Sequence, residues 1–252
     1  MNLPRRVVII GASSGIGREV ARIYISLGCR VGVAARRVEP LLELKALAPD
    51  RVDVAAIDVT DPEAPAALLP LLDVPGGTDT LLIASGVGFR NPALDISKEL
   101  SIVATNALGF TRIADDAFSY FSRALSSAVI PRATLAAITS VAGTKGMGDA
   151  PAYSASKRFG STYLTALSQL AHTRRLPLST VDIRPGFVAT DFLAADSAFP
   201  MTMDPSRVAR LIVRAISRRR PVAVIDWRWR IVVSLWRLIP RWLWIRIPLS
   251  RG

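Results

Sequence analysis

Short hydrophobic runs alternate with longer amphipathic stretches along most of the chain. The runs are continuous and rich in Val, Ile and Ala, which is typical of strands buried on both faces of a sheet. They lie at residues 6–10, 30–35, 52–57, 80–85, 134–140, 179–183 and 221–225. Helix-length segments lie between them, for example 15–27, 61–72 and 155–172. This alternation predicts an α/β fold, a parallel seven-stranded sheet covered by helices on both faces.

Composition narrows the class of protein. The 252 residues, half of them hydrophobic, suit one domain with a large core. A single Cys and a single His exclude a disulfide framework and a Cys/His metal cluster, so no metal site is predicted. The chain enters its first strand without a signal-peptide pattern. We therefore expect a cytoplasmic protein in a reducing compartment.

Positive charge is concentrated near the C-terminus. The net charge is +12, yet residues 1–203 hold 20 Lys and Arg against 18 Asp and Glu. Residues 204–252 hold 12 against 2, and all five tryptophans follow residue 226. We expect a catalytic domain over residues 1–226 and a basic, Trp-rich amphipathic tail over residues 227–252.

A glycine-rich segment, GASSGIG at 11–17, follows the first predicted strand and precedes a helix. Glycines there allow a tight turn and let backbone N–H groups approach a pyrophosphate at the helix N-terminus. A plain strand-to-helix turn would also use glycines, but the position after the first strand of an alternating fold favours a dinucleotide. The predicted phosphate-binding residues are Gly11, Ser13, Ser14, Gly15, Ile16 and Gly17.

Two arginines, Arg36 and Arg37, end the second predicted strand. An acidic residue in this region would bind a free ribose 2′-hydroxyl, whereas guanidinium groups suit a 2′-phosphate. NADP(H) is therefore the predicted cofactor. The alternative is a solvated helix start, and the neighbouring Glu39 would compete with the arginines.

Tyr153 and Lys157 lie four residues apart, so a helix would carry both on one face. Many solvated helices carry such a pair, and the spacing alone does not indicate catalysis. An ammonium close to a phenol would favour the phenolate and lower its pKa from ~10. The pair is a candidate acid/base whose assignment depends on the surrounding motifs.

Those motifs together resemble the short-chain dehydrogenase/reductase family. The resemblance extends from about Val7 to about Ile225. It rests on the order and spacing of GASSGIG (11–17), DVT (58–60), TNALG (105–109), TSVAG (139–143), YSASK (153–157) and RPGFVAT (184–190). It implies a doubly wound Rossmann fold and an NADP-dependent oxidoreductase that interconverts ketones and alcohols.

The resemblance also implies a catalytic set of Asn106, Ser140, Tyr153 and Lys157. In such a set Tyr153 is the general acid/base, and Lys157 lowers its pKa and binds the nicotinamide ribose. Ser140 positions the substrate oxygen, and Asn106 holds a water that connects Lys157 to solvent. The other implied cofactor contacts are Asp58, Val59, Gly86, Pro185, Gly186, Val188 and Thr190.

The sequence departs from the family pattern at two places. Ile10 precedes the first glycine, where many members have Thr. The segment Ile83-Ala84-Ser85-Gly86 replaces the usual Asn-Asn-Ala-Gly. These changes bear on local stability and cofactor affinity rather than on proton transfer.

The tail has the composition of a helix lying in a bilayer interface. Its longest uncharged run, 231–236, is far shorter than the ~20 residues of a membrane span. On a helix the stripe of Arg230, Ser234, Arg237 and Arg241 would be polar, with a kink at Pro240. Three roles remain open, namely docking on an anionic membrane, covering the substrate pocket or a subunit interface, and binding an acidic partner. Nucleic acid is not expected, because the aromatic residues lie among aliphatic ones.

The expected function is NADPH-dependent reduction of a hydrophobic ketone, for example a long-chain 3-keto lipid. The apolar segment 191–203 is expected to line the pocket. A soluble 3-ketoacyl thioester or a steroid is the alternative substrate. A non-catalytic NADP(H)-binding membrane-surface or scaffold protein is the alternative of another class. The resemblance implies a homo-oligomer, and the tail would place the protein at the inner face of a membrane.

Overall fold

A seven-stranded parallel sheet forms the centre of the computed structural model, which describes residues 3–189 and 201–247. The strands are β1 (Arg6–Ile10), β2 (Arg30–Ala35), β3 (Val52–Ala56), β4 (Thr80–Ile83), β5 (Ala133–Ile138), β6 (Leu178–Arg184) and β7 (Val222–Val224). Their order is β3-β2-β1-β4-β5-β6-β7. The predicted doubly wound fold is confirmed.

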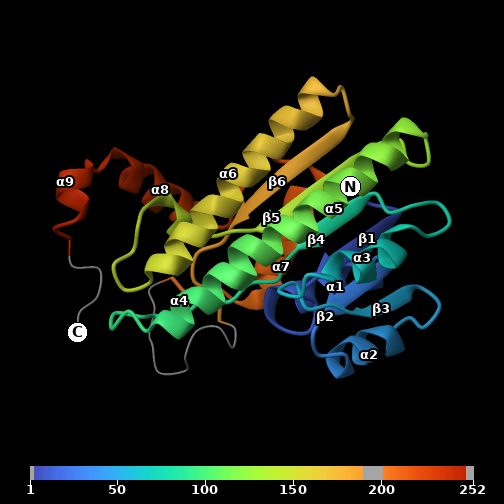
Figure 1. Cartoon of the computed structure of the whole chain (residues 1–252), viewed down its shortest axis with the longest axis horizontal. Helices are drawn as coiled ribbons and strands as arrows, with labels where there is room; N and C mark the ends of the chain where they lie inside the picture. The colour runs from blue at the N-terminus through green and yellow to red at the C-terminus, as the bar shows by residue number, and fades with distance from the viewer. Residues whose placement is uncertain (1–2, 190–200, 248–252) are drawn as a thin grey trace.

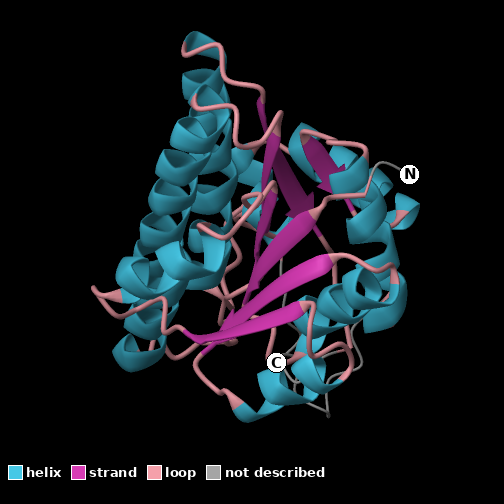
Figure 2. Cartoon of the chain, turned by 90° about the vertical axis from the view of Figure 1, so that its right-hand side faces the viewer, coloured by secondary structure: helices cyan, strands magenta, loops and turns pink. Residues whose placement is uncertain are grey.

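Helices cover both faces of this sheet, as Figure 2 shows. They are α1 (Gly15–Ser26), α2 (Glu39–Ala46), α3 (Ala64–Leu72), α4 (Ile96–Val103), α5 (Phe110–Ser126), α6 (Pro151–Thr173), α7 (Pro205–Ser217), α8 (Trp227–Leu238) and α9 (Arg241–Trp244). A π-helical turn (Ala104–Gly109) joins α4 to α5, and a 3₁₀ turn (Val141–Thr144) follows β5. One core cluster packs α1, α2 and α7 on the sheet, and another packs α3, α5 and α6 on the opposite face.

The strand order places a crevice between β1 and β4. The chain runs outward from β1 to β3 and then crosses back, so β4 pairs with the other side of β1. Ligands of open α/β sheets bind outside the carboxyl ends of the strands at this reversal. The predicted strand 80–85 ends at Ile83, although the Ala84 N–H still donates to the Ile10 carbonyl at 2.8 Å and the Ser85 backbone lies against Gly11.

The starts of α6 and α7 are defined by Pro151 and Asp204. The helix α6 begins at Pro151, four residues before the expected start, so Tyr153 lies within its first turn. Proline is favoured at the first helical position because its missing N–H would be unpaired there anyway. The helix α7 begins directly after Asp204, and Asp204 Oδ1 accepts a hydrogen bond of 2.9 Å from the Arg207 N–H.

The tail forms two helices, α8 and α9, with Pro240 between them as predicted. Figure 1 shows both helices, in red, at one end of the molecule. Trp229 and Val233 are buried and join the core cluster of α1 and α7. In the described ranges, no helix has both the length and the apolar character needed to cross a membrane.

Candidate active site

The glycine-rich loop brings α1 close to the crevice between β1 and β4. Gly11 has φ +90°, and a Cβ there would lie 2.5 Å from the Ser85 nitrogen. A Cβ on Gly17 would lie 2.3 Å from the Gly11 carbonyl oxygen. Any side chain at these positions would push the helix and the two strands apart. Ser13, Ser14 and Ile16 are partly exposed on the loop.

The N-terminus of α1 fits a bound anion. Ser14 precedes the helix in an extended conformation, and its side chain makes no capping hydrogen bond. The first turn, which opens at Gly15, contains no acidic residue. The first N–H groups of a helix have no intrahelical partners and carry a partial positive charge. The loop therefore has the donor set that a pyrophosphate requires.

Basic and acidic groups meet at the ends of β2 and β3. Arg36 and Arg37 are exposed directly after β2. Partial burial raises the pKa of Asp58, but two hydrogen bonds from Thr60 and the nearby charge of Arg36 lower it below its usual value overall. The charge of Arg36 thus acts on Asp58, and the next residue, Val59, is buried. This is the side of the crevice where the sequence predicts an adenosine 2′-phosphate.

Asn106 is buried in the π-helical turn and pairs with the chain that follows β4. Its Oδ1 accepts from the Val87 N–H at 2.8 Å, and its Nδ2 donates to the Val87 carbonyl at 2.7 Å. Nδ2 also donates to Ser156 Oγ at 3.1 Å on α6. Turns of π-helix often occur at functional sites. Here the turn inserts the Asn106 side chain between the β4 loop and α6.

Lys157 lies beside Asn106, with both groups facing Gly86. A Cβ on Gly86 would lie 3.2 Å from both Lys157 Nζ and Asn106 Oδ1, so Gly86 leaves the room that both polar groups occupy. Nζ donates to the Ile138 carbonyl at 3.1 Å. Burial lowers the pKa of Lys157 to about 8, and the Asp182 carboxylate acts in the opposite direction.

Tyr153 and Ser140 are hydrogen-bonded through their side chains. Ser140 is buried after β5, and its Oγ also accepts from the Ala142 N–H at 3.1 Å. Burial raises the pKa of Tyr153, while the bond to Ser140 partly opposes that rise. The expected lowering is not found, because burial of the hydroxyl outweighs the opposing bond from Ser140. Lys157 Nζ lies 5.6 Å from the centroid of the tyrosine ring.

A cavity of about 10 Å³ lies behind these groups. This volume is close to the minimum that one water molecule needs. Asn106, Lys157, Ser156 and Thr139 are among the residues that line it. The cavity therefore offers several polar partners to one small polar molecule.

The sequence reasoning missed a buried ionic network beneath Lys157. Asp182 Oδ1 accepts from Thr139 Oγ1 at 2.5 Å, and Asp182 Oδ2 forms an ion pair of 2.6 Å with Arg184. Asp182 is 3% exposed on β6. A carboxylate in the middle of a hydrophobic strand was the available signal, because such groups are rarely buried without partners.

The segment after β6 packs against the tail. The Pro185 carbonyl accepts from the Val141 N–H at 3.1 Å, and Val188 is buried in a bridge to Met203. A Cβ on Gly186 would come within 2.1 Å of the Trp229 indole. Thr190 and most of the segment 191–203 lie outside the described residues.

The tail also holds the loop between Ser140 and Tyr153. Lys145 Nζ donates to the Ile239 carbonyl at 2.8 Å, and Trp244 Nε1 donates to the Gly146 carbonyl at 2.8 Å. Edge-to-face ring contacts connect Trp244 to Trp236, Trp236 to Trp229, and Trp229 to Phe187. The tail therefore contacts both segments that flank the Ser140–Tyr153 pair.

Comparisons with known proteins identify the family of this chain. A family model described as short chain dehydrogenase matches residues 5–200. An uncharacterized oxidoreductase of Myxococcus xanthus is 30% identical over 250 residues, covering 94% of this chain and 93% of its own.

Solved structures share the fold at lower identity. A short chain dehydrogenase from Burkholderia cenocepacia in complex with NADP has a TM-score of 0.80 at 17% identity, over 98% of both chains. A 3-ketoacyl-(acyl-carrier-protein) reductase from Brucella melitensis complexed with NADH has a TM-score of 0.76 at 18% identity, over 88% of this chain and 96% of its own. The chain therefore belongs to the short-chain dehydrogenase/reductase family and is an oxidoreductase of that NAD(P)(H)-using type.

Proposed function

We propose that this enzyme reduces a hydrophobic ketone to an alcohol with NADPH, and that Tyr153 donates the proton. The observation that carries the proposal is the hydrogen bond between the Tyr153 and Ser140 side chains, with Lys157 Nζ 5.6 Å from the tyrosine ring. A substrate oxygen next to this pair would accept hydrogen bonds from both hydroxyl groups. The bound dinucleotide would supply the hydride.

Lys157 and Asn106 would return the proton to Tyr153. A pKa of about 8 allows Lys157 to gain and lose a proton near neutral pH, as a relay group must. The small cavity lined by Asn106 and Lys157 would hold the water that connects the relay to solvent. Asn106 is oriented for this role by its two hydrogen bonds to Val87.

Arg36 and Arg37 support the choice of NADP(H) over NAD(H). Both are exposed after β2, and the charge of Arg36 contributes to the lowered pKa of Asp58. Guanidinium groups there would bind a 2′-phosphate through charge-assisted hydrogen bonds. The α1 N-terminus, Gly86 and the segment Pro185–Val188 would hold the rest of the cofactor.

The variant Tyr153→Phe tests the proposal. It should lower the turnover of a ketone by about 10²–10⁴-fold and leave NADPH affinity unchanged, because only the proton donor is removed. Tyr163→Phe is a matched control on the same helix, since that hydroxyl bonds Asp115 outside the site. Unchanged turnover in Tyr153→Phe would contradict the assignment. A wild-type protein that binds NADPH and reduces no ketone would support the non-catalytic alternative.

The tail supports a lipid substrate delivered from a membrane surface. We name six of its exposed apolar side chains the outer face: Trp227, Ile231, Leu235, Leu238, Trp242 and Ile245. The arginines of the predicted polar stripe are exposed beside them. Tryptophan and arginine together suit an interface with anionic lipid. The protein would then act at the inner face of a membrane. The buried tail residues Trp229 and Trp244 would meanwhile contact the loops next to the active site.

A ketone panel with and without anionic vesicles tests this role. The panel contains a long-chain 3-keto lipid, a steroid and a 3-ketoacyl thioester. Leu238→Glu/Trp242→Glu should abolish vesicle binding and reduce lipid turnover only, because both side chains are on the outer face. Leu42→Glu/Leu47→Glu makes the same charge change at exposed positions of α2 and its end. Vesicle-independent turnover of soluble ketones would instead assign the tail a structural role.

A cluster of exposed apolar residues on α4, the π-helical turn and α6 supports a homo-oligomer. Leu100, Val103, Leu108 and Phe159 are exposed on α4, the π-helical turn and α6, which pack together. Exposed apolar patches of this kind mark interaction surfaces. Sedimentation of wild-type protein and of Leu108→Glu would show whether these residues join two copies.

A further inference from the structure

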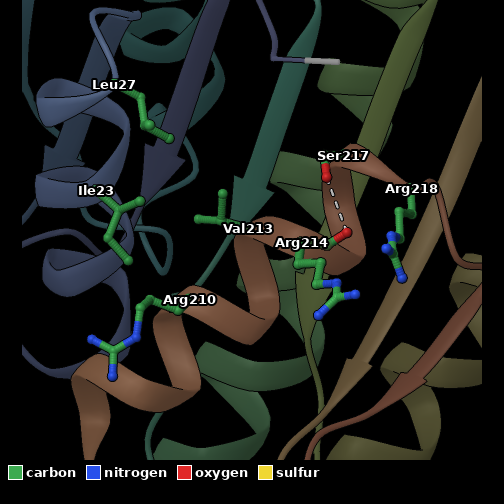
Figure 3. Close-up of a pocket in the computed structure, with 7 residues that line it drawn as sticks. All are labelled: Ile23, Leu27, Arg210, Val213, Arg214, Ser217 and Arg218. Carbon is green, nitrogen blue, oxygen red and sulfur yellow. Dashed lines mark hydrogen bonds between the residues drawn. The ribbon is translucent and has the colours of Figure 1, made fainter. Parts of the chain in front are cut away.

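A groove lies between α1 and α7, away from the residues discussed so far (Figure 3). Its volume is about 610 Å³. Figure 3 shows Ile23 on α1 and Leu27 just after it facing Val213 on α7. Arg210 and Arg214 lie on α7, and Arg218 directly follows it. The apolar side chains form the floor, and Leu27 is 42% exposed. An exposed leucine in a hollow with other apolar side chains is typical of an interaction surface.

The arginines form a regular row. Arg210, Arg214 and Arg218 occur at every fourth position, and all three are exposed. Four residues of helix correspond to about 6 Å, so the row spans about 12 Å. In the part of the chain that the structure describes, no acidic side chain lies within 4 Å of these guanidinium groups. The row therefore presents three exposed guanidinium groups at a fixed spacing beside the apolar floor. Arg210 also lowers the pKa of Asp204 and donates to Ser206 Oγ at 3.2 Å.

We propose that this groove binds an acidic amphipathic helix of another protein. Carboxylates at every fourth position of such a helix have the same spacing as the three arginines, and its neighbouring apolar side chains would cover Ile23 and Leu27, which lie beside the buried Val213. Helices with an apolar face commonly bind in grooves of this kind. The opposed charges give the helix its orientation along α7.

Other occupants match the groove less well. A lipid concentrates its charge in one headgroup and would leave most of the 12 Å row unpaired. A nucleic acid would pair with the arginines but has no aliphatic group for the floor. A second copy of this chain placed symmetrically on α7 would bring two arginine rows together, and like charges repel.

The groove lies near the amino ends of the strands, whereas Tyr153 lies near their carboxyl ends. Its lining residues lie toward the C-terminal ends of α1 and α7, and these helices end where β2 and β7 begin. The crevice with Ser140 and Lys157 is at the carboxyl ends of the strands. Partner binding here would therefore leave access to the active site open, so the inference goes beyond the proposed function.

A synthetic peptide tests the proposal on the full-length protein. The probe is a fluorescent helical peptide of about 18 residues with Glu at three positions four apart and Leu beside them, a length of about 27 Å. We expect saturable binding with one peptide per chain. Arg210→Glu/Arg214→Glu should weaken it by about tenfold or more through lost attraction and new repulsion. Leu27→Ser should also weaken peptide binding, because the substitution removes an exposed apolar side chain from the floor of the groove.

Two controls keep the result specific. Arg220→Glu/Arg174→Glu makes the same change in net charge at exposed positions outside the groove and should leave binding unchanged. A peptide with Lys in place of the three Glu should bind Arg210→Glu/Arg214→Glu and not the wild type. Ketone turnover should stay at the wild-type level in the groove variants.

Several outcomes would overturn the proposal. The first is that the Glu peptide shows no saturable binding to the wild type. The second is that Arg220→Glu/Arg174→Glu weakens peptide binding as much as Arg210→Glu/Arg214→Glu does. The third is that the Lys peptide does not bind Arg210→Glu/Arg214→Glu. Anionic vesicles or a single-stranded oligonucleotide that bind in the peptide's place, with the same dependence on Arg210 and Arg214, would assign the groove to those ligands instead.

Discussion

The indole of Trp229 lies directly against the Cα of Gly186, so closely that a Cβ on this glycine would come within 2.1 Å of the ring. Trp229 is 2% exposed and belongs to the tail, while Gly186 follows β6 next to the candidate active site. The contact connects the last helices of the chain to the edge of the sheet where the chemistry is proposed.

Gly186→Ala should therefore destabilise the protein. The buried indole cannot move without disturbing its neighbours, and overpacking of a core costs about 1–3 kcal/mol. Chemical denaturation measures the loss. Trp229→Leu should also be destabilising alone, yet the double variant should lose less than the sum, because the shorter side chain makes room for the new methyl group. Additive losses would show that the contact is not responsible.

Lys157 should make the stability of the cofactor-free enzyme depend on pH. Its pKa is lowered from 10.5 in the unfolded reference to about 8 in the folded protein. Between these values the unfolded chain binds more protons, so the cost of burying this group falls as pH rises. Compared with Lys157→Met, the wild type should gain about 2–3 kcal/mol from pH 7 to pH 10.

The matched control for this pH series is Lys98→Met, since Lys98 is exposed on α4. Urea denaturation of each variant at several pH values provides the comparison. A constant difference between wild type and Lys157→Met at every pH would contradict the lowered pKa.

Asn106→Ala should destabilise the loop after β4. The change removes both partners of the Val87 backbone groups, and unsatisfied buried polar groups cost about 1–3 kcal/mol each. Ser156→Ala removes only the third contact of Asn106 and should cost much less. Thermal denaturation compares the two. Equal losses would mean that the bonds to Val87 are not what stabilises the loop.

Replacement of both arginines after β2 should change the cofactor preference. In Arg36→Gln/Arg37→Gln the ratio of kcat/KM for NADPH to that for NADH should fall by about 100-fold, since charge-assisted bonds contribute about 1.5–3 kcal/mol. Stability should change little because both side chains are exposed. Arg22→Gln/Arg30→Gln, at other exposed positions, should preserve the ratio; a similar fall there would indicate a general effect of charge.

The sequence by itself determined the class of fold and the candidates. Continuous apolar runs separated by helix-length segments specify a buried parallel sheet, and all seven runs are strands. The motif order pointed to Asn106, Ser140, Tyr153 and Lys157, and the structure brings these residues together at one edge. Local signals sufficed there because strand ends and helix starts fix where such residues lie.

Only the tertiary structure decided how the polar groups and the tail are arranged. The direction of the Tyr153 pKa depends on burial and on the bond to Ser140, neither of which the i, i+4 spacing reveals. A periodic pattern likewise shows that a helix has apolar positions but not which of them find a partner. In the tail, Trp229 and Trp244 are buried while Leu238 and Trp242 are exposed, because contacts far apart in sequence select the buried face.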